Sequence, residues 1–314
     1  MTALIIGSHG QDGTLMKFFF DELGRKYLAF NRVGISKNNS IIASSAKLTP
    51  QILSDIFEEF GISEIYFLVG ENDSDEVRGE GKTSNIGYFW TSKEILYMVL
   101  EAIAKVKIRV KFLYANSALI FAGTGVYPQN ENTLAKPLEN YALQKLAMAS
   151  ELQYFQEKND FFQLYNAIFY NHESIYRKPK FFTRKVIESA IKIANSGYGT
   201  DKIVINKPNA IIDMSHAEDF IANAVNIVDS DKPGTYVFSS GKGVIAKDFV
   251  LEVFEFLNLS VDDKVIFSRG NEVLTSTPLI GDCSKIRSVL GQLYVSSKEN
   301  LSIRLTNDWL THLG

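Results

Sequence analysis

The sequence has little cysteine and little histidine, with one Cys and four His in 314 residues. The single Cys283 excludes an internal disulfide and has no neighbours that could complete a metal cluster, so we expect a packing residue and no metal site. No apolar run approaches the roughly twenty residues that span a bilayer, and no basic segment, apolar core and cleavage site open the chain. With 33 basic and 36 acidic residues, the net charge is −3. These absences predict a cytoplasmic protein with neither a membrane nor a nucleic-acid partner.

The remaining composition is that of an ordinary globular protein. Hydrophobic residues make up 46% of the chain and charged residues 22%. A chain of this length can bury one large core or two unequal ones. No internal repeat, low-complexity tract or linker divides the sequence into independent units.

The first residues carry the strongest local pattern. Ala3–Ile6 is a short apolar run of strand character, and Thr14–Leu23 has apolar residues at helical spacing. Between them stand Gly7, Gly10 and Gly13. Glycines at this spacing allow a tight turn and let the backbone approach a pyrophosphate, while the N–H groups at the helix N-terminus point at the phosphates. The pattern predicts a dinucleotide-binding site.

The end of the next strand indicates which dinucleotide is bound. Tyr27–Phe30 is typical of a second strand, and Arg32 follows about twenty residues beyond the glycines. An acidic residue there would bind a ribose 2′-hydroxyl, whereas an arginine can pair with a 2′-phosphate. Arg32 therefore favours NADP(H), with NAD(H) as the alternative.

The rest of the chain alternates strand and helix patterns, which predicts an α/β fold with a Rossmann-type, doubly wound parallel sheet. We expect residues 1–170 to form the NAD(P)-binding domain. Residues 171–314 would form a smaller substrate domain, partly interleaved with the first. Val33–Ser45 is polar and lacks a period, so we expect a loop there.

Three residues in the first half have the chemistry of a hydride-transfer site. Tyr141 and Lys145 are four apart on a predicted helix and share one face, and Ser117 follows a predicted strand. A neighbouring ammonium and the positive nicotinamide of a cofactor would favour the phenolate of Tyr141. Tyr141 could then move a proton on a sugar hydroxyl while Ser117 and Lys145 support it.

These residues and several further stretches resemble the extended short-chain dehydrogenase/reductase superfamily, and within it the GDP-mannose 4,6-dehydratase family. The matching stretches are Gly10-Gln11-Asp12-Gly13, Pro128-Gln129-Asn130-Glu131, Asn171-His172-Glu173-Ser174, Phe181-Phe182-Thr183-Arg184-Lys185, Asp213–Asp219 and Gly281–Lys285.

The resemblance implies NADP(H) as cofactor and a GDP-linked manno-type sugar as substrate. The cofactor site would comprise Gly7, Gly10, Gln11, Asp12, Gly13, Arg32, Leu68, Tyr141 and Lys145. The substrate site would comprise Ser117, Asn171, Lys185, Arg269 and Glu272. The basic loop 176–180 corresponds to one that reaches a neighbouring subunit in the family, which implies a homodimer or homotetramer.

The sequence also departs from the family at positions that bear on the reaction. Leu119 stands where the dehydratase has the glutamate that removes the C5 proton, so we expect no efficient 4,6-dehydration. Ile211 and Ile212 replace two arginines, Asp73 replaces a histidine near the active site, and Lys47 replaces an aspartate near the adenine.

The leading hypothesis is an oxidoreductase that acts at C4 of a GDP-linked manno-type hexose or heptose. The alternatives are a nucleotide-sugar epimerase, a dehydratase in which Asp73 or Glu71 substitutes for the missing base, and a non-enzymatic protein that senses the dinucleotide.

Overall fold

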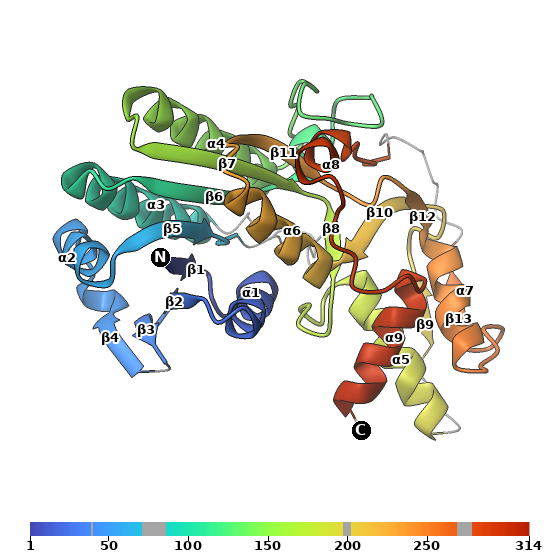
Figure 1. Ribbon diagram of the computed structural model, residues 1–314. Helices are drawn as coiled ribbons and strands as arrows, with labels where there is room; N and C mark the ends of the chain where they lie inside the picture. Colours follow the sequence, from blue (N-terminus) through green and yellow to red (C-terminus); the bar gives the residue numbers. More distant parts are fainter. Residues whose placement is uncertain (39, 71–85, 197–201, 269–277, 314) are drawn as a thin grey trace.

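The computed structural model describes residues 1–38, 40–70, 86–196, 202–268 and 278–313, without the side chains of 86–90 and 196 (Figure 1). Among them, eight strands form one sheet in the order β11-β7-β6-β5-β1-β2-β3-β4. Their bounds are β1 Thr2–Ile6, β2 Lys26–Phe30, β3 Gly34–Lys37, β4 Ser40–Ser44, β5 Ile62–Phe67, β6 Val110–Ser117, β7 Phe162–Phe169 and β11 Gly234–Phe238. From β11 to β2 every neighbouring pair is parallel.

Helices cover both faces of this sheet. The helices of the whole described chain are α1 Gln11–Glu22, α2 Pro50–Phe60, α3 Ile86–Val106, α4 Asn140–Lys158, α5 Phe182–Ser196, α6 Ala217–Asp229, α7 Ala246–Phe256, α8 Ser284–Leu290 and α9 Leu301–Leu313, of which α5, α7 and α9 pack in the smaller unit described below. Buried residues of α1 and α6 pack in one core cluster, whereas those of α2, α3 and α4 pack in a second. Strand β1 lies between the two clusters and is almost entirely buried, as expected of a strand covered on both faces. The predicted doubly wound α/β fold is confirmed.

The predicted loop over Val33–Ser45 is wrong, because β3 and β4 form an antiparallel hairpin at the edge of the sheet. Each strand has only four or five residues, too few to establish a period in the sequence. Ile35 is fully buried while Ile41 is exposed, so the hairpin has one covered face. Asn38 adopts a left-handed backbone (φ 48°) between the strands, which an asparagine tolerates.

A smaller unit lies beyond the carboxyl end of β7 (Figure 1). Its strands in the described part of the chain are β8 Asn171–Glu173, β9 Ile203–Ile205, β10 Ile211–His216, β12 Gly243–Ile245 and β13 Val265–Phe267. They pair as β12-β10-β8 and β13-β9, and helices α5, α7 and α9 share a third core cluster with β9, β10 and β13. Between these elements the chain returns to the large sheet, where β11 pairs with β7. The domain division at residue 170 stays a prediction.

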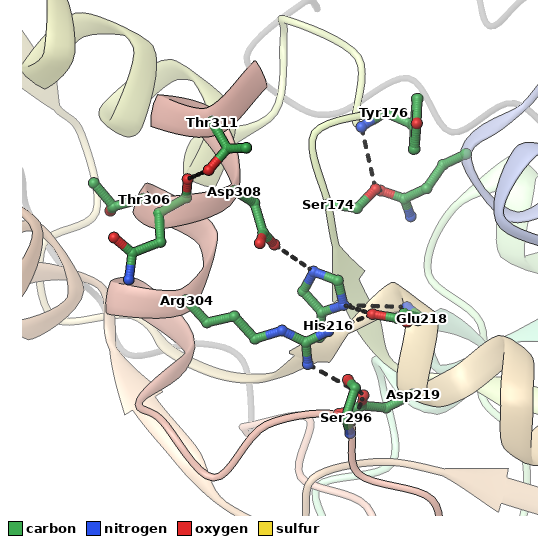
Figure 2. Close-up of polar contacts among 12 residues, drawn as sticks. Ser174, Tyr176, His216, Glu218, Asp219, Ser296, Arg304, Thr306, Asp308 and Thr311 are labelled. Carbon is green, nitrogen blue, oxygen red and sulfur yellow. Dashed lines mark hydrogen bonds and ion pairs between the residues drawn. The ribbon is translucent and has the colours of Figure 1, made fainter. Parts of the chain in front are cut away.

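Helix α9 is held against the start of α6 by a cluster of polar contacts (Figure 2). His216, which precedes α6, donates from Nε2 to Asp308 at 3.0 Å, and its Nδ1 accepts the backbone N–H of Glu218. Arg304 contacts the carboxylates of Glu218 at 2.6 Å and Asp219 at 3.2 Å. Because His216 ends β10, the neighbour of β8, these contacts fix the strand that supports Asn171.

In the part of the chain that the structure describes, no helix has both the length and the apolar character that crossing a bilayer would require.

Candidate active site

The glycine turn after β1 has the geometry that its spacing predicts. Gly7 lies in the left-handed region (φ 93°), and its carbonyl accepts the N–H of Gly10 at 3.0 Å. A Cβ atom on Gly13 would lie 2.4 Å from the carbonyl oxygen of Gly7, so α1 packs too closely on the turn for any larger residue. Gly10 provides no side chain to cap α1. The first N–H groups of the helix are therefore available to an anion.

A cavity of about 190 Å³ lies at the carboxyl ends of β1, β5, β6 and β7, beside this turn. It brings together ten of the predicted site residues: Gly7, Gly10, Gln11, Asp12, Gly13, Leu68, Ser117, Tyr141, Lys145 and Asn171. These residues come from elements spread over the first 171 positions. Ligands of open α/β sheets bind at this edge, so the cavity is the candidate active site.

Lys145 lines the cavity and is held in place by backbone carbonyls. Its Nζ donates to the carbonyl oxygens of Ala115 at 2.6 Å and Val69 at 2.9 Å, and the side chain is almost fully buried. Burial lowers the pKa of its ammonium to about 8, although the carboxylate of Asp12 opposes the change. Nζ also lies 5.8 Å from the ring centroid of Tyr141, so the two side chains share one face of α4 as predicted.

Burial also disfavours the charged form of the Tyr141 phenol. It raises the pKa of Tyr141 to about 12, and the positive charge of Arg177 and a hydrogen bond with Ser117 act in the opposite direction. The phenolate expected from the Tyr–Lys spacing is thus not produced by Lys145 alone, because the protein interior that surrounds both groups disfavours both charges. The charge of a bound nicotinamide would have to contribute as well.

Ser117 is oriented by the backbone and by a buried amide. Its Oγ accepts the N–H of Leu119 at 3.3 Å, and its own N–H donates to Oδ1 of Asn116 at 2.8 Å. Asn116 in turn donates to Asn166 on β7 at 3.1 Å. Ser117 therefore ends β6 in a fixed position beside Tyr141.

Gln11 and Asp12, predicted cofactor residues, also connect the glycine turn to β8. Gln11 donates to the carbonyl oxygen of His172 at 2.9 Å and accepts from Ser174 at 2.9 Å. Oδ1 of Asp12 lies 3.0 Å from Nε2 of His172, whose Nδ1 lies 2.7 Å from the carbonyl oxygen of Tyr170. Both ring nitrogens thus face acceptors, a geometry that needs a proton on each.

The pKa shifts of Asp12 and His172 agree with that geometry. Burial lowers the pKa of His172, but the carboxylate of Asp12 outweighs burial and the pKa is raised. Burial raises the pKa of Asp12, but His172 outweighs it and the pKa is lowered. His172 lines the cavity, yet sequence reasoning did not assign it to the site, although it stands in the stretch Asn171–Ser174.

Gly70 and Arg177 are among the further cavity residues that sequence reasoning did not assign to the site. A Cβ atom on Gly70 would lie 2.8 Å from Nζ of Lys145 and 3.4 Å from the hydroxyl of Tyr141. Arg177 also lines the cavity, although the sequence indicated only that its loop is basic. Neither residue type carries a signal of its own, because glycine is common after strands and arginine is common in loops.

The remaining predicted residues lie elsewhere. Arg32 is exposed after β2, near Asn31, whose side chain lies 3.1 Å from Nε2 of His9. Lys185 lines a second cavity of about 290 Å³ with Val204, Asn206, Lys207 and Ile212. Predicted residues that lie outside the described part of the chain are Arg269 and Glu272, together with the substitute bases Glu71 and Asp73.

Leu119 lines the active-site cavity next to Ser117, with an aliphatic side chain that cannot exchange a proton. Within the residues that the structure describes, no group of three or more His, Cys, Asp or Glu side chains is arranged to bind a metal.

Comparison with known proteins connects this geometry to a family. A family model described as GDP-mannose 4,6 dehydratase matches residues 4–292. A relative, GDP-mannose 4,6-dehydratase of Yersinia enterocolitica, is 25% identical over 303 residues, which cover 89% of this chain and 80% of the relative.

Solved structures share the fold at lower identity. RMD from Pseudomonas aeruginosa complexed with NADPH has a TM-score of 0.76 at 14% identity, over 99% of both chains. The dTDP-glucose 4,6-dehydratase from Bacillus anthracis in complex with NAD has a TM-score of 0.77 at 12% identity, over 99% of this chain and 97% of that one.

Proposed function

The chain belongs to the GDP-mannose 4,6-dehydratase family, and from that premise we propose that it transfers a hydride between NAD(P) and a ring carbon, C4, of a GDP-linked manno-type hexose or heptose. The reaction forms or reduces a 4-keto sugar without 4,6-dehydration. Its family consists of NAD(P)-dependent short-chain dehydrogenase/reductase enzymes that act on nucleotide sugars.

The observation that carries the proposal is the convergence of Ser117, Tyr141 and Lys145 in one cavity beside the glycine turn. Tyr141 would take or give the proton of the reacting hydroxyl, and Ser117 would hydrogen-bond the same oxygen. Lys145, held by two carbonyls, would keep a positive charge next to the phenol. A bound nicotinamide would supply or accept the hydride.

The absence of dehydration rests on Leu119. Elimination of water across C5 and C6 needs a group that removes the C5 proton, and loss of such a group commonly lowers the rate about 10²- to 10⁴-fold. Leu119 lines the cavity beside Ser117 and provides no such group.

NADP(H) is the proposed cofactor because Arg32 follows β2, where a cation can pair with a 2′-phosphate. NAD(H) is the alternative, and a solved structure of this fold holds each of them. For the nucleotide of the substrate we propose the second cavity, where Lys185 and Lys207 lie among apolar side chains that suit a base. Arg269 and Glu272 remain predicted contacts of its ribose.

A nucleotide-sugar epimerase is the second candidate, because oxidation and re-reduction of one carbon would use the same Tyr141 and Lys145. It predicts a product of unchanged mass and no net consumption of cofactor. A dehydratase with Glu71 or Asp73 as the base predicts a product lighter by one water. A dinucleotide-sensing protein predicts that Tyr141→Phe changes no measured activity. A homodimer or homotetramer and a cytoplasmic location stay predictions.

The test is to incubate the purified protein with NADP⁺ or NADPH and with GDP-mannose or GDP-manno-heptose. The proposal expects a change in absorbance at 340 nm and a product that differs from the substrate by two hydrogens. A product lighter by one water, or one of unchanged mass, would replace it with the dehydratase or the epimerase.

A further inference from the structure

Arg177 is a cation of the active-site cavity that has no part in the proposed mechanism. Its loop follows β8, and its side chain lines the same cavity as Tyr141 and Lys145. It is largely covered, with 18% of the side chain exposed. A covered guanidinium in an active-site wall calls for a role, because burying a cation is costly unless it interacts with other groups.

Arg177 is held in place from several sides. Its guanidinium carbon lies 3.7 Å from the ring centroid of Phe181, and its Nε lies 3.2 Å from Oε2 of Glu173. The same Oε2 of Glu173, which is buried, accepts the hydroxyl of Thr183 at 2.5 Å. The carbonyl of Arg177 accepts a hydrogen bond from Arg184 at the start of α5. Such fixation removes the usual flexibility of an arginine and so makes its charge effective at a defined point.

Hydrogen bonds to Ser174 hold the loop that carries Arg177. The N–H of Arg177 donates to the carbonyl oxygen of Ser174 at 3.0 Å. The N–H of Tyr176 donates to Oγ of Ser174 at 3.2 Å (Figure 2). The same hydroxyl donates a hydrogen bond to Oε1 of Gln11, which follows the first two glycines of the turn. The loop is therefore connected to both the phosphate-binding turn and the cavity wall.

Charged side chains from three elements influence the pKa of the Tyr141 phenol. Asp12 on α1 contributes a negative charge and Arg177 on the loop a positive one. Nζ of Lys145 on α4 lies 5.8 Å from the centroid of the Tyr141 ring. Burial and Asp12 both raise the pKa of Tyr141, and Arg177 is the leading influence that lowers it, ahead of Ser117. Lys145 is itself made less cationic by burial, since its pKa falls to about 8.

On the basis of the proposed function, we propose that Arg177 is a positioning residue of its own chain's active site, whose fixed guanidinium acts across the cavity to stabilise the phenolate of Tyr141. No atom of Arg177 has to touch the substrate for this effect. The site is then complete within one chain, whereas the family resemblance implies that this loop serves a neighbouring subunit.

The test compares the wild type with Arg177→Gln, Arg177→Lys and the control Lys180→Gln, which changes a cation of the same loop outside the cavity lining. Each protein is labelled with [¹³Cζ]tyrosine and titrated by NMR from pH 8 to 11.5 without substrate. The same variant carrying Tyr141→Phe identifies the Tyr141 signal, and circular dichroism monitors folding. Because no sugar is involved, the result is independent of whether the proposed reaction is correct.

We expect the tyrosinate fraction of Tyr141 at pH 11 to fall about three- to tenfold in Arg177→Gln. Arg177→Lys should resemble Arg177→Gln at this pH, because a lysine with an ordinary pKa near 10.5 is mostly neutral at pH 11 whereas an arginine is still charged. Lys180→Gln should match the wild type. A titration in Arg177→Gln that overlays the wild type would overturn the inference. Recovery of hydride transfer when Arg177→Gln is mixed with Tyr141→Phe would also overturn it, because the arginine would then serve a neighbouring subunit.

Discussion

The backbone of Gly70 passes so close to Lys145 that a Cβ atom on Gly70 would lie 2.8 Å from Nζ. Nζ cannot retreat without breaking its hydrogen bonds to Val69 and Ala115. We therefore expect Gly70→Ala to lower the turnover number about ten- to a hundredfold, because small displacements of a reacting group are costly. Steady-state kinetics would measure the loss. Thermal unfolding measured alongside would show how much of the loss comes from lower stability, because breaking a hydrogen bond of the buried ammonium also destabilises the fold.

The lowered pKa of Lys145 predicts an alkaline limit to activity. The ammonium loses its proton as the pH rises through about 8 rather than near 10.5, so kcat/KM for hydride transfer should fall above about pH 8. The same shift means that the buried charge opposes folding below pH 8, and that this penalty is relieved between pH 8 and 10.5.

A pH profile from 6 to 10.5 with Lys145→Arg as the comparison checks this prediction. The arginine retains its charge, so its residual activity should not decline in that range. An equal decline in both proteins would assign the alkaline limit to another group.

Leu119→Glu should introduce dehydration. The side chain of Leu119 lines the cavity and is only partly buried, so we expect a carboxylate to be tolerated there. Gain of a positioned base is typically worth about 10²- to 10⁴-fold. Mass spectrometry should detect a product lighter by one water, with solvent deuterium at C5. Leu119→Gln has nearly the same shape but no base, so dehydration by that variant would contradict the explanation.

Arg32→Ala should weaken NADP(H) binding about ten- to a hundredfold and leave NAD(H) binding nearly unchanged. The reason is the loss of a charged hydrogen bond to the 2′-phosphate, worth about 1.5–3 kcal/mol. Calorimetric titration with each cofactor measures the two dissociation constants, and their ratio tests the prediction. Lys37→Ala, which removes an exposed cation at the end of β3, is the matched control. An equal loss for both cofactors would mean that Arg32 does not recognise the phosphate.

The contacts of α9 predict a stability effect far from the cavity. Arg304→Ala removes the partner of Glu218 and Asp219 and should lower the free energy of unfolding by about 1–2 kcal/mol, less than for a fully buried pair because Glu218 is 41% exposed. Urea denaturation measures the change. Lys298→Ala, on the exposed segment before α9, should stay within about 0.5 kcal/mol of the wild type.

Sequence patterns predicted the large sheet well, because a strand buried on both faces, such as β1, is apolar throughout and easily recognised. The same reasoning failed for β3 and β4, whose few residues alternate too briefly. In the site, the spacing of Tyr141 and Lys145 predicted their shared face but not their pKa values. Those depend on burial by elements distant in the sequence.

Residues that act through position were the hardest to predict. Gly70 matters because of the space it leaves for Lys145, and Arg177 matters because Phe181 and Glu173 hold it. Lys185 lines a cavity separate from the one that contains Tyr141, and its place in the substrate site stays a prediction. Such relationships arise only when the chain has folded.

The return of β11 to the large sheet has a consequence for synthesis in the cell. Strand β7 ends at Phe169, but its outer neighbour begins only at Gly234, after β8, α5, β9, β10 and α6 have been made. Until then the outer edge of β7 has unpaired backbone groups and can pair with another chain. A nascent chain stalled before residue 234 is therefore expected to aggregate or to bind a chaperone. A chain in which β11 has left the ribosome can pair this strand with β7.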